Sequence, residues 1–100
     1  MDYQIKWTSP AYRDLVDIIE FVIRDSPKYA SSLTERILES VRSLNQFPFR
    51  SRIVPEFNRK DIRELFVMNY RIIFNIKDEE IIILAVIHFA RELTGNVPDH

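Results

Sequence analysis

Three polar side chains stand out because each is set among apolar residues: Arg63, Arg71 and His88. A guanidinium binds a phosphate through two parallel hydrogen bonds, which makes Arg71 a candidate anion-binding group. An imidazole exchanges a proton near neutral pH, which makes His88 a candidate acid. Both residues also have a structural interpretation. Arg71 would then lie over a sheet and pair with a surface carboxylate, a contact worth roughly 0–1 kcal/mol, and His88 would be a satisfied interior histidine.

These residues lie in three short apolar runs that predict β-strands at 62–67, 70–76 and 81–89. Each run is rich in β-branched or aromatic residues and ends at polar turn residues, which is the pattern of strands joined as a meander. The last run is apolar at nearly every position, which indicates a strand that is covered on both faces or lies in mid-sheet. The sheet is therefore the element that must position Arg71 and His88.

Two helices precede these strands. Thr8-Ser9-Pro10 and Ser26-Pro27 each place a hydroxyl residue before a proline, which is a helix start signal. Apolar residues then recur at spacings of three and four, up to Asp25 in the first segment and up to Phe47-Pro48 in the second. So short a connection between the segments predicts an antiparallel helical hairpin whose apolar stripes form core.

The remaining segments complete the order of elements. Residues 3–7 alternate between apolar and polar types and predict a first strand, whereas 49–61 has no period and predicts a loop. After the sheet, 90–93 predicts a turn or short helix and 94–100 a frayed tail. The order is β-α-α-β-β-β. We therefore predict a single α+β domain over residues 1–100, with an antiparallel or mixed sheet packed by an N-terminal two-helix hairpin.

Composition narrows the class of protein. The 100 residues include no cysteine, which excludes a disulfide scaffold, a thiol nucleophile and a cysteine-ligated metal, and fits a cytoplasmic protein. No signal peptide or membrane-spanning run is visible, and we expect no metal, no cofactor and no membrane partner. The net charge is −1, yet residues 49–76 hold six basic and three acidic side chains, a local charge of +3. That surplus indicates either a local basic surface or an ordinary mixed one.

The order of elements and several motifs resemble the RelE/ParE superfamily of toxins from type II toxin–antitoxin modules, which includes plasmid stabilisation proteins. The resemblance covers nearly the whole chain. It is carried by Trp7-Thr8-Ser9-Pro10-Ala11, Asp14-Leu15, Ser26-Pro27, Phe47-Pro48, Pro55-Glu56, Arg63-Glu64-Leu65, Tyr70-Arg71-Ile72, Val86-Ile87-His88 and Ala90-Arg91-Glu92-Leu93. The resemblance implies a growth-arresting toxin that a cognate antitoxin neutralises by wrapping around it.

One branch of the superfamily, the RelE-like and YoeB-like endoribonucleases, cuts mRNA in the ribosomal A site. Resemblance to that branch implies metal-independent cleavage with Glu56 as the base, Arg71 as the phosphate clamp and His88 as the acid. Further candidate RNA or phosphate contacts are Arg50, Arg52, Arg63 and Phe89. Glu56, Arg50 and Arg52 are more simply solvated loop charges. Phe89 is more simply core or partner surface, and it stands where YoeB-like enzymes carry tyrosine.

The ParE-like branch inhibits DNA gyrase and needs no known catalytic residue. The long helical hairpin and the near-neutral net charge favour this second branch. A third interpretation is a chain kept only to bind its antitoxin. We expect a cognate antitoxin whose amphipathic helix or strand covers apolar surface of the toxin. The expected target is ribosome-bound mRNA, with DNA gyrase as the alternative.

Overall fold

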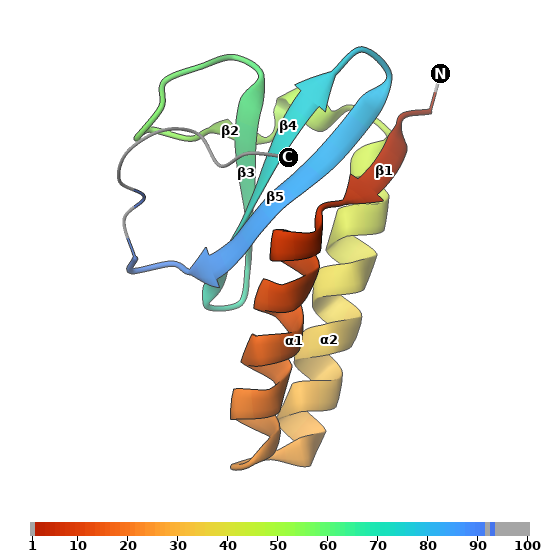
Figure 1. Ribbon diagram of the computed structural model, residues 1–100. Helices are drawn as coiled ribbons and strands as arrows, with labels where there is room; N and C mark the ends of the chain where they lie inside the picture. The colour runs from red at the N-terminus through yellow and green to blue at the C-terminus, as the bar shows by residue number, and fades with distance from the viewer. Residues whose placement is uncertain (1, 92, 94–100) are drawn as a thin grey trace.

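A computed structural model describes residues 2–91 and 93 of the chain (Figure 1). In this part of the chain, a strand is followed by two helices and then by four further strands. With two short 3-10 helices labelled η, the elements are β1 Gln4–Trp7, α1 Ser9–Ile23, α2 Pro27–Arg42, η1 Ser43–Asn45, η2 Pro48–Arg50, β2 Arg52–Ile53, β3 Ile62–Val67, β4 Tyr70–Lys77 and β5 Glu80–His88. None of the described helices is long and apolar enough to cross a membrane.

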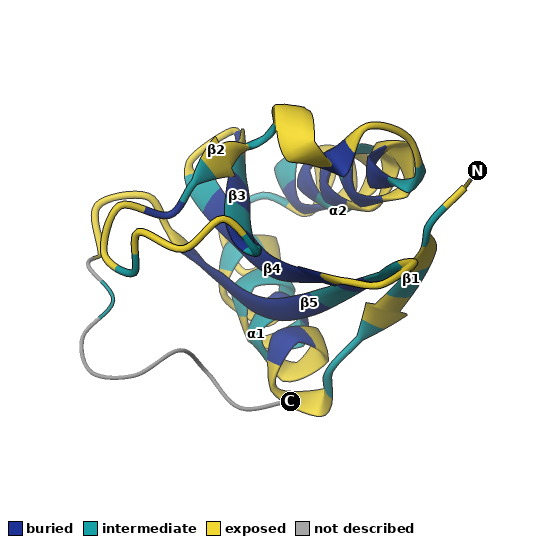
Figure 2. Cartoon of the chain, turned by 90° about the horizontal axis from the view of Figure 1, so that it is seen from above, coloured by how far each residue is buried: buried dark blue, intermediate teal, exposed yellow. Residues whose placement is uncertain are grey.

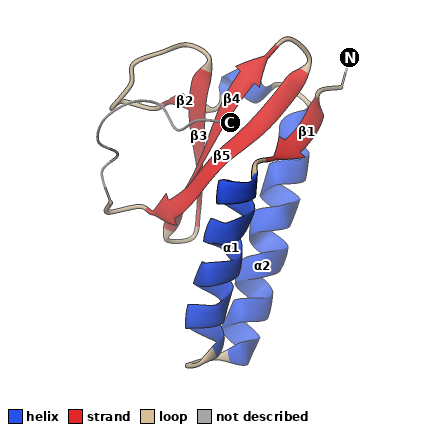
Figure 3. Cartoon of the chain, in the orientation of Figure 1, coloured by secondary structure: helices blue, strands red, loops and turns tan. Residues whose placement is uncertain are grey.

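The strands form one mixed sheet in the order β1-β5-β4-β3-β2. β1 runs parallel to β5, and the other neighbours are antiparallel. The predicted α+β architecture is confirmed (Figure 3). One strand was not predicted, because β2 lies in the segment 49–61 that was expected to be a loop. A two-residue strand offers too little alternation to be recognised in a sequence. The expected tail, 94–100, lies outside the described residues.

Both helices begin where the sequence predicts. The Thr8 side chain accepts a hydrogen bond from the backbone N–H of Ala11 at 3.2 Å, and Ser26 accepts one from Tyr29 at 3.1 Å. These bonds satisfy backbone donors that the first turn leaves free. The prediction that the second helix continues to Phe47 is wrong, since α2 gives way to η1 and η2. Phe47 itself has φ 56°, in the left-handed region that is unfavourable for an aromatic residue.

The two faces of the sheet have cores of different size. Both helices pack on one face, which we call the helix face, in a cluster that includes Leu15, Leu33, Ile72, Phe74 and Val86. The other face, which we call the open face, carries a smaller buried cluster: Val54, Ile62, Ile73, Leu84, Ala85 and Ile87. Figure 2 shows that β4 and β5 are the most completely buried strands. Side chains set into these two strands are therefore held rigidly on one face or the other.

A β-bulge interrupts the pairing of β4 with β5. Phe74 pairs with Ile83 while Ile73 pairs with Ala85, so Leu84 is an extra residue without a partner in the ladder. Because side chains alternate along a strand, one extra residue moves every later side chain of that strand to the opposite face of the sheet. The bulge therefore decides on which face the last side chains of β5 lie.

Candidate functional site

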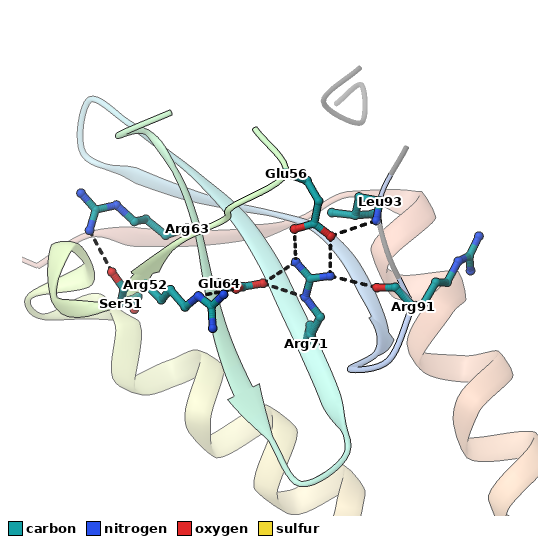
Figure 4. A network of polar contacts seen from close by, with 8 residues as sticks. All are labelled: Ser51, Arg52, Glu56, Arg63, Glu64, Arg71, Arg91 and Leu93. Atoms are coloured by element: carbon teal, nitrogen blue, oxygen red, sulfur yellow. Dashed lines mark hydrogen bonds and ion pairs between the residues drawn. The ribbon is translucent and has the colours of Figure 1, made fainter. Parts of the chain in front are cut away.

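The centre of the open face is Arg71, which lies on β4 with its side chain 6% exposed (Figure 4). Its Nη1 and Nη2 donate to the two carboxylate oxygens of Glu56, each at 2.8 Å. Its Nε donates to Glu64 Oε1 at 2.7 Å, and Nη2 lies at 2.7 Å from the same oxygen. Nη1 also donates to the backbone carbonyl of Arg91 at 2.9 Å. Both edges of the guanidinium that can make paired bonds are thus occupied by protein carboxylates.

The charges in this cluster stabilise one another. The hydrogen bonds from Arg71 lower the pKa of Glu56 to about 2, against the opposing effect of partial burial. The same bonds, led by the one to Glu56, raise the pKa of Arg71. Glu64 is buried, with its side chain 1% exposed, and its Oε2 lies 3.2 Å from Arg52 Nε without the alignment of a hydrogen bond. Two guanidinium groups and two carboxylates therefore balance in charge.

The cluster ties three parts of the chain together. Glu56 comes from the segment between β2 and β3, Glu64 from β3 and Arg71 from β4. Glu56 Oε2 also accepts a hydrogen bond from the backbone N–H of Leu93 at 3.0 Å. Arg71 thus holds a surface loop and the segment after β5 against the sheet. The position of Arg71 fits a structural anchor, whereas no paired N–H groups remain for a phosphate.

His88 lies on the other face of the sheet. It pairs with Tyr70, whereas Arg71 pairs with Ile87, and paired residues point to the same face. The His88 ring meets the Tyr70 ring edge-on with centroids 5.8 Å apart, and Tyr70 packs on the helix-face cluster. Its Nδ1 accepts a hydrogen bond from the backbone N–H of Ala90 at 3.2 Å. The structure brings Glu56 and Arg71 together, as expected, but not His88.

The other predicted contact residues differ in how far their side chains are engaged by contacts within the protein. Arg63 donates to the backbone carbonyls of Lys60, Phe49 and Ser51 at 2.8–2.9 Å, so it holds two loops together. Arg52 lies over the Phe66 ring, with the guanidinium carbon 5.7 Å from the ring centroid. Arg50 lies over the Phe47 ring at 4.6 Å. Phe89 is 54% exposed. Arg50, Arg52 and Phe89 remain accessible to a ligand, and their binding roles stay predictions.

A cleft of about 440 Å³ lies over the Arg71 cluster. It is lined by Arg52, Pro55, Glu56, Glu64, Phe66, Arg71 and Phe89. In the described part of the chain, no group of three His, Cys, Asp or Glu side chains is placed to hold a metal ion. The charged side chains at the bottom of the cleft are therefore already paired with one another. They lie between two exposed aromatic rings, Phe66 and Phe89.

Two structurally important polar residues were not among the site residues predicted from the sequence. Glu64 is the second carboxylate of the Arg71 cluster, and its signal was a charged residue in the middle of an apolar run. Asp14 on α1 accepts a hydrogen bond from the backbone N–H of Val86 at 3.0 Å, beyond the point where β1 stops pairing with β5. Burial raises the pKa of Asp14. Asp14 thus satisfies a donor on the uncovered part of the β5 edge.

Comparison with known proteins gives matches over most of the chain. The family model for the ParE toxin of the type II toxin–antitoxin system parDE matches residues 5–93. The solved structure of the chromosomal ParDE system from P. aeruginosa has a TM-score of 0.70 and 27% identity, over 86% of this chain and 95% of that one. The RelBE2 toxin–antitoxin complex from Mycobacterium tuberculosis has a TM-score of 0.57 and 22% identity, over 88% of this chain and 99% of that one, which shows the fold alone. No curated protein sequence matches the chain.

Proposed function

Because the chain belongs to the ParE toxin family of type II toxin–antitoxin systems, we propose that it arrests growth by binding DNA gyrase and not by cutting mRNA. Gyrase is the target that the resemblance to the ParE-like branch implies. A toxin of this kind acts as a binding protein, so it needs a rigid surface and no acid–base pair. Its cognate antitoxin would cover part of that surface.

The observation that supports this proposal is the state of the Arg71 guanidinium. A phosphate clamp for RNA cleavage needs free paired N–H groups, and Glu56 and Glu64 take both pairs. The Glu56 carboxylate is itself bound by that guanidinium, which makes it a weak base. A general acid must lie within hydrogen-bonding reach of the leaving group, and His88 points away from this cleft. The geometry therefore favours binding over RNA cleavage.

The partner of the toxin follows from the same family. The similar solved structures are of toxin–antitoxin systems, ParDE in one case and RelBE2 in the other. We propose that a small antitoxin covers apolar surface on α1, where Tyr12, Phe21 and Ile23 are exposed. The antitoxin would then prevent growth arrest by occupying the toxin surface.

The proposal is tested by expressing the toxin in cells that carry a reporter plasmid. Inhibition of gyrase predicts that the plasmid loses negative supercoils and that DNA breaks accumulate before translation falls. Primer extension on abundant mRNAs should show no new 5′ ends at that time. If new 5′ ends appear within codons while supercoiling is unchanged, the toxin cuts ribosome-bound mRNA and the proposal is wrong. Co-expression of the antitoxin is the control that ties either effect to the toxin.

A further inference from the structure

We propose that the edge of the molecule beside β2 binds a single strand of nucleic acid. The residues concerned, which we call the β2 edge surface, are two phenylalanines and two arginines: Phe47, Phe49, Arg50 and Arg63. The inference goes beyond the proposed function, because inhibition of gyrase requires only a contact with protein. Direct contact with a nucleic-acid strand would add a second element of recognition.

In this surface each arginine lies over one of the rings. The guanidinium carbons of Arg50 and Arg63 are 4.6 Å and 5.1 Å from the ring centroids of Phe47 and Phe49. Arg63 also donates to the backbone carbonyls of Phe49 and Ser51, which fixes η2 and the start of β2 against β3. These contacts hold the stacked pairs in place before any ligand arrives.

Both phenylalanines are exposed to solvent: Phe47 by 63% and Phe49 by 52%. Rings so exposed add little to the core. Phe47 also has a positive φ of 56°, a conformation that costs a non-glycine residue on the order of 1–3 kcal/mol. Apolar exposure combined with backbone strain is typical of a binding surface.

A hollow of about 510 Å³ lies beside η2 and is separate from the cleft over Arg71. Its aromatic lining comes from Tyr3, Phe47 and Phe49, and its polar lining includes Asp2 and Gln46. A nucleobase has a flat face that stacks on aromatic rings and a polar edge that meets carboxylate and amide groups. The lining of the hollow matches both parts of a base.

One cation for a phosphate lines this hollow, and a second lies near the same edge of the molecule. Arg50 lines it, and neither Arg50 nor Lys60 forms an ion pair with any described residue. Lys60 is close to the same edge, because its carbonyl accepts a hydrogen bond from Arg63. Unpaired cations beside exposed rings are the combination that single-strand binding uses.

Single-stranded nucleic acid fits this surface better than a duplex or an acidic peptide. In a duplex, the faces of the bases are already stacked on one another and are not available to the phenylalanine rings. An acidic peptide would satisfy the cations but has no flat ring with a polar edge to fill the hollow. Single-stranded DNA and RNA share the required chemistry, and the experiment below distinguishes them.

The test is fluorescence anisotropy of labelled oligonucleotides of about 12 residues with the purified toxin, in the absence of gyrase. Oligo-dT, oligo-U and a duplex of equal length are compared. We expect single strands to bind more tightly than the duplex. Phe49→Leu should weaken binding roughly 5- to 100-fold, because it removes a stacking face. Arg50→Gln should reduce the slope of log affinity against log salt by about 0.7.

Matched controls lie at the hairpin end, remote from β2. Arg24→Gln and Lys28→Gln remove exposed cations from that end and should leave binding unchanged. Circular dichroism checks that all variants are folded. The proposal is overturned if the toxin binds no single strand, if the controls weaken binding equally, or if polyglutamate binds with the same dependence on Phe49 and Arg50. Because gyrase is absent, failure here leaves the proposed function standing.

Discussion

Arg71 and His88 lie on opposite faces of the sheet, although they belong to neighbouring strands and differ by one step in register. Arg71 points to the open face, where Glu56 and Glu64 hold it. His88 points to the helix face and meets Tyr70. One catalytic site therefore cannot use both side chains in this arrangement. The separation makes the Arg71 cluster a structural unit, and its stability can be measured.

Replacing Arg71 with alanine should lower the free energy of unfolding by about 3–5 kcal/mol, because the buried Glu64 would lose the guanidinium that hydrogen-bonds it. The measurement is urea unfolding at neutral pH. The matched control is Arg24→Ala, an exposed arginine that should change the stability by less than about 0.5 kcal/mol. An Arg71→Ala protein as stable as the wild type would show that the cluster does not anchor the loop and the sheet.

Stability should fall in acid because of Glu56. Its pKa is lowered from 4.5 to about 2, so the folded state favours the ionised carboxylate. That contribution is complete above the unfolded pKa and is lost as the pH falls from about 5 to about 2. After discounting for solvent screening, we expect it to be on the order of 1 kcal/mol.

The control for this pH dependence is Glu56→Gln, studied by urea unfolding at several pH values. The paired carboxylate of Asp61, whose pKa is also lowered, remains in both proteins and therefore cancels in the comparison. The difference in stability between wild type and variant should shrink as the pH falls through this range. A difference that stays constant with pH would contradict the assignment.

Asp14 should protect the edge of β5. Alanine at this position leaves the buried N–H of Val86 without its acceptor, which costs about 1–3 kcal/mol. Hydrogen exchange at the Val86 amide should become faster, whereas Asp14→Asn, which keeps an acceptor oxygen, should stay close to the wild type. Asp17→Ala, at an exposed position of the same helix, is the control. Unchanged exchange at Val86 in the alanine variant would argue against this role.

His88 should be dispensable for growth arrest. Its side chain is exposed, and its Nδ1 accepts one hydrogen bond from a backbone N–H next to the turn, so His88→Ala should fold normally. A gyrase-binding toxin then loses little activity, and the number of colonies after induction should match the wild type. A folded His88→Ala protein that no longer arrests growth would support a catalytic histidine instead.

Local patterns were sufficient to predict both helices and four of the five strands. Thr8 and Ser26 begin the helices as their side chains and following prolines indicate, and the three long strands follow the apolar runs. The C-terminal end of the second helix and the two-residue β2 were not predicted, because tertiary contacts decide both. Glu56 and Arg71 are 15 residues apart, and only the path of the loop brings them together.

The position of His88 shows why a site is harder to predict than a fold. If the register of the Phe74–Ile83 pair continued to the end of β5, His88 would lie opposite Asn69 and share a face with Arg71. The bulge at Leu84 reverses this outcome. No turn residue or glycine marks the bulge, since the run 81–87 is apolar throughout. A single unpaired residue thus changes which side chains can act together.

The most direct test is a supercoiling assay with purified toxin and purified DNA gyrase, in which relaxed plasmid, ATP and enzyme are fixed and the toxin is titrated. Wild-type and His88→Ala toxins should inhibit supercoiling at similar concentrations, and added antitoxin should reverse the inhibition. A parallel translation reaction should proceed without mRNA cleavage. Full supercoiling at every toxin concentration, together with cleavage of ribosome-bound mRNA, would contradict inhibition of gyrase by this toxin.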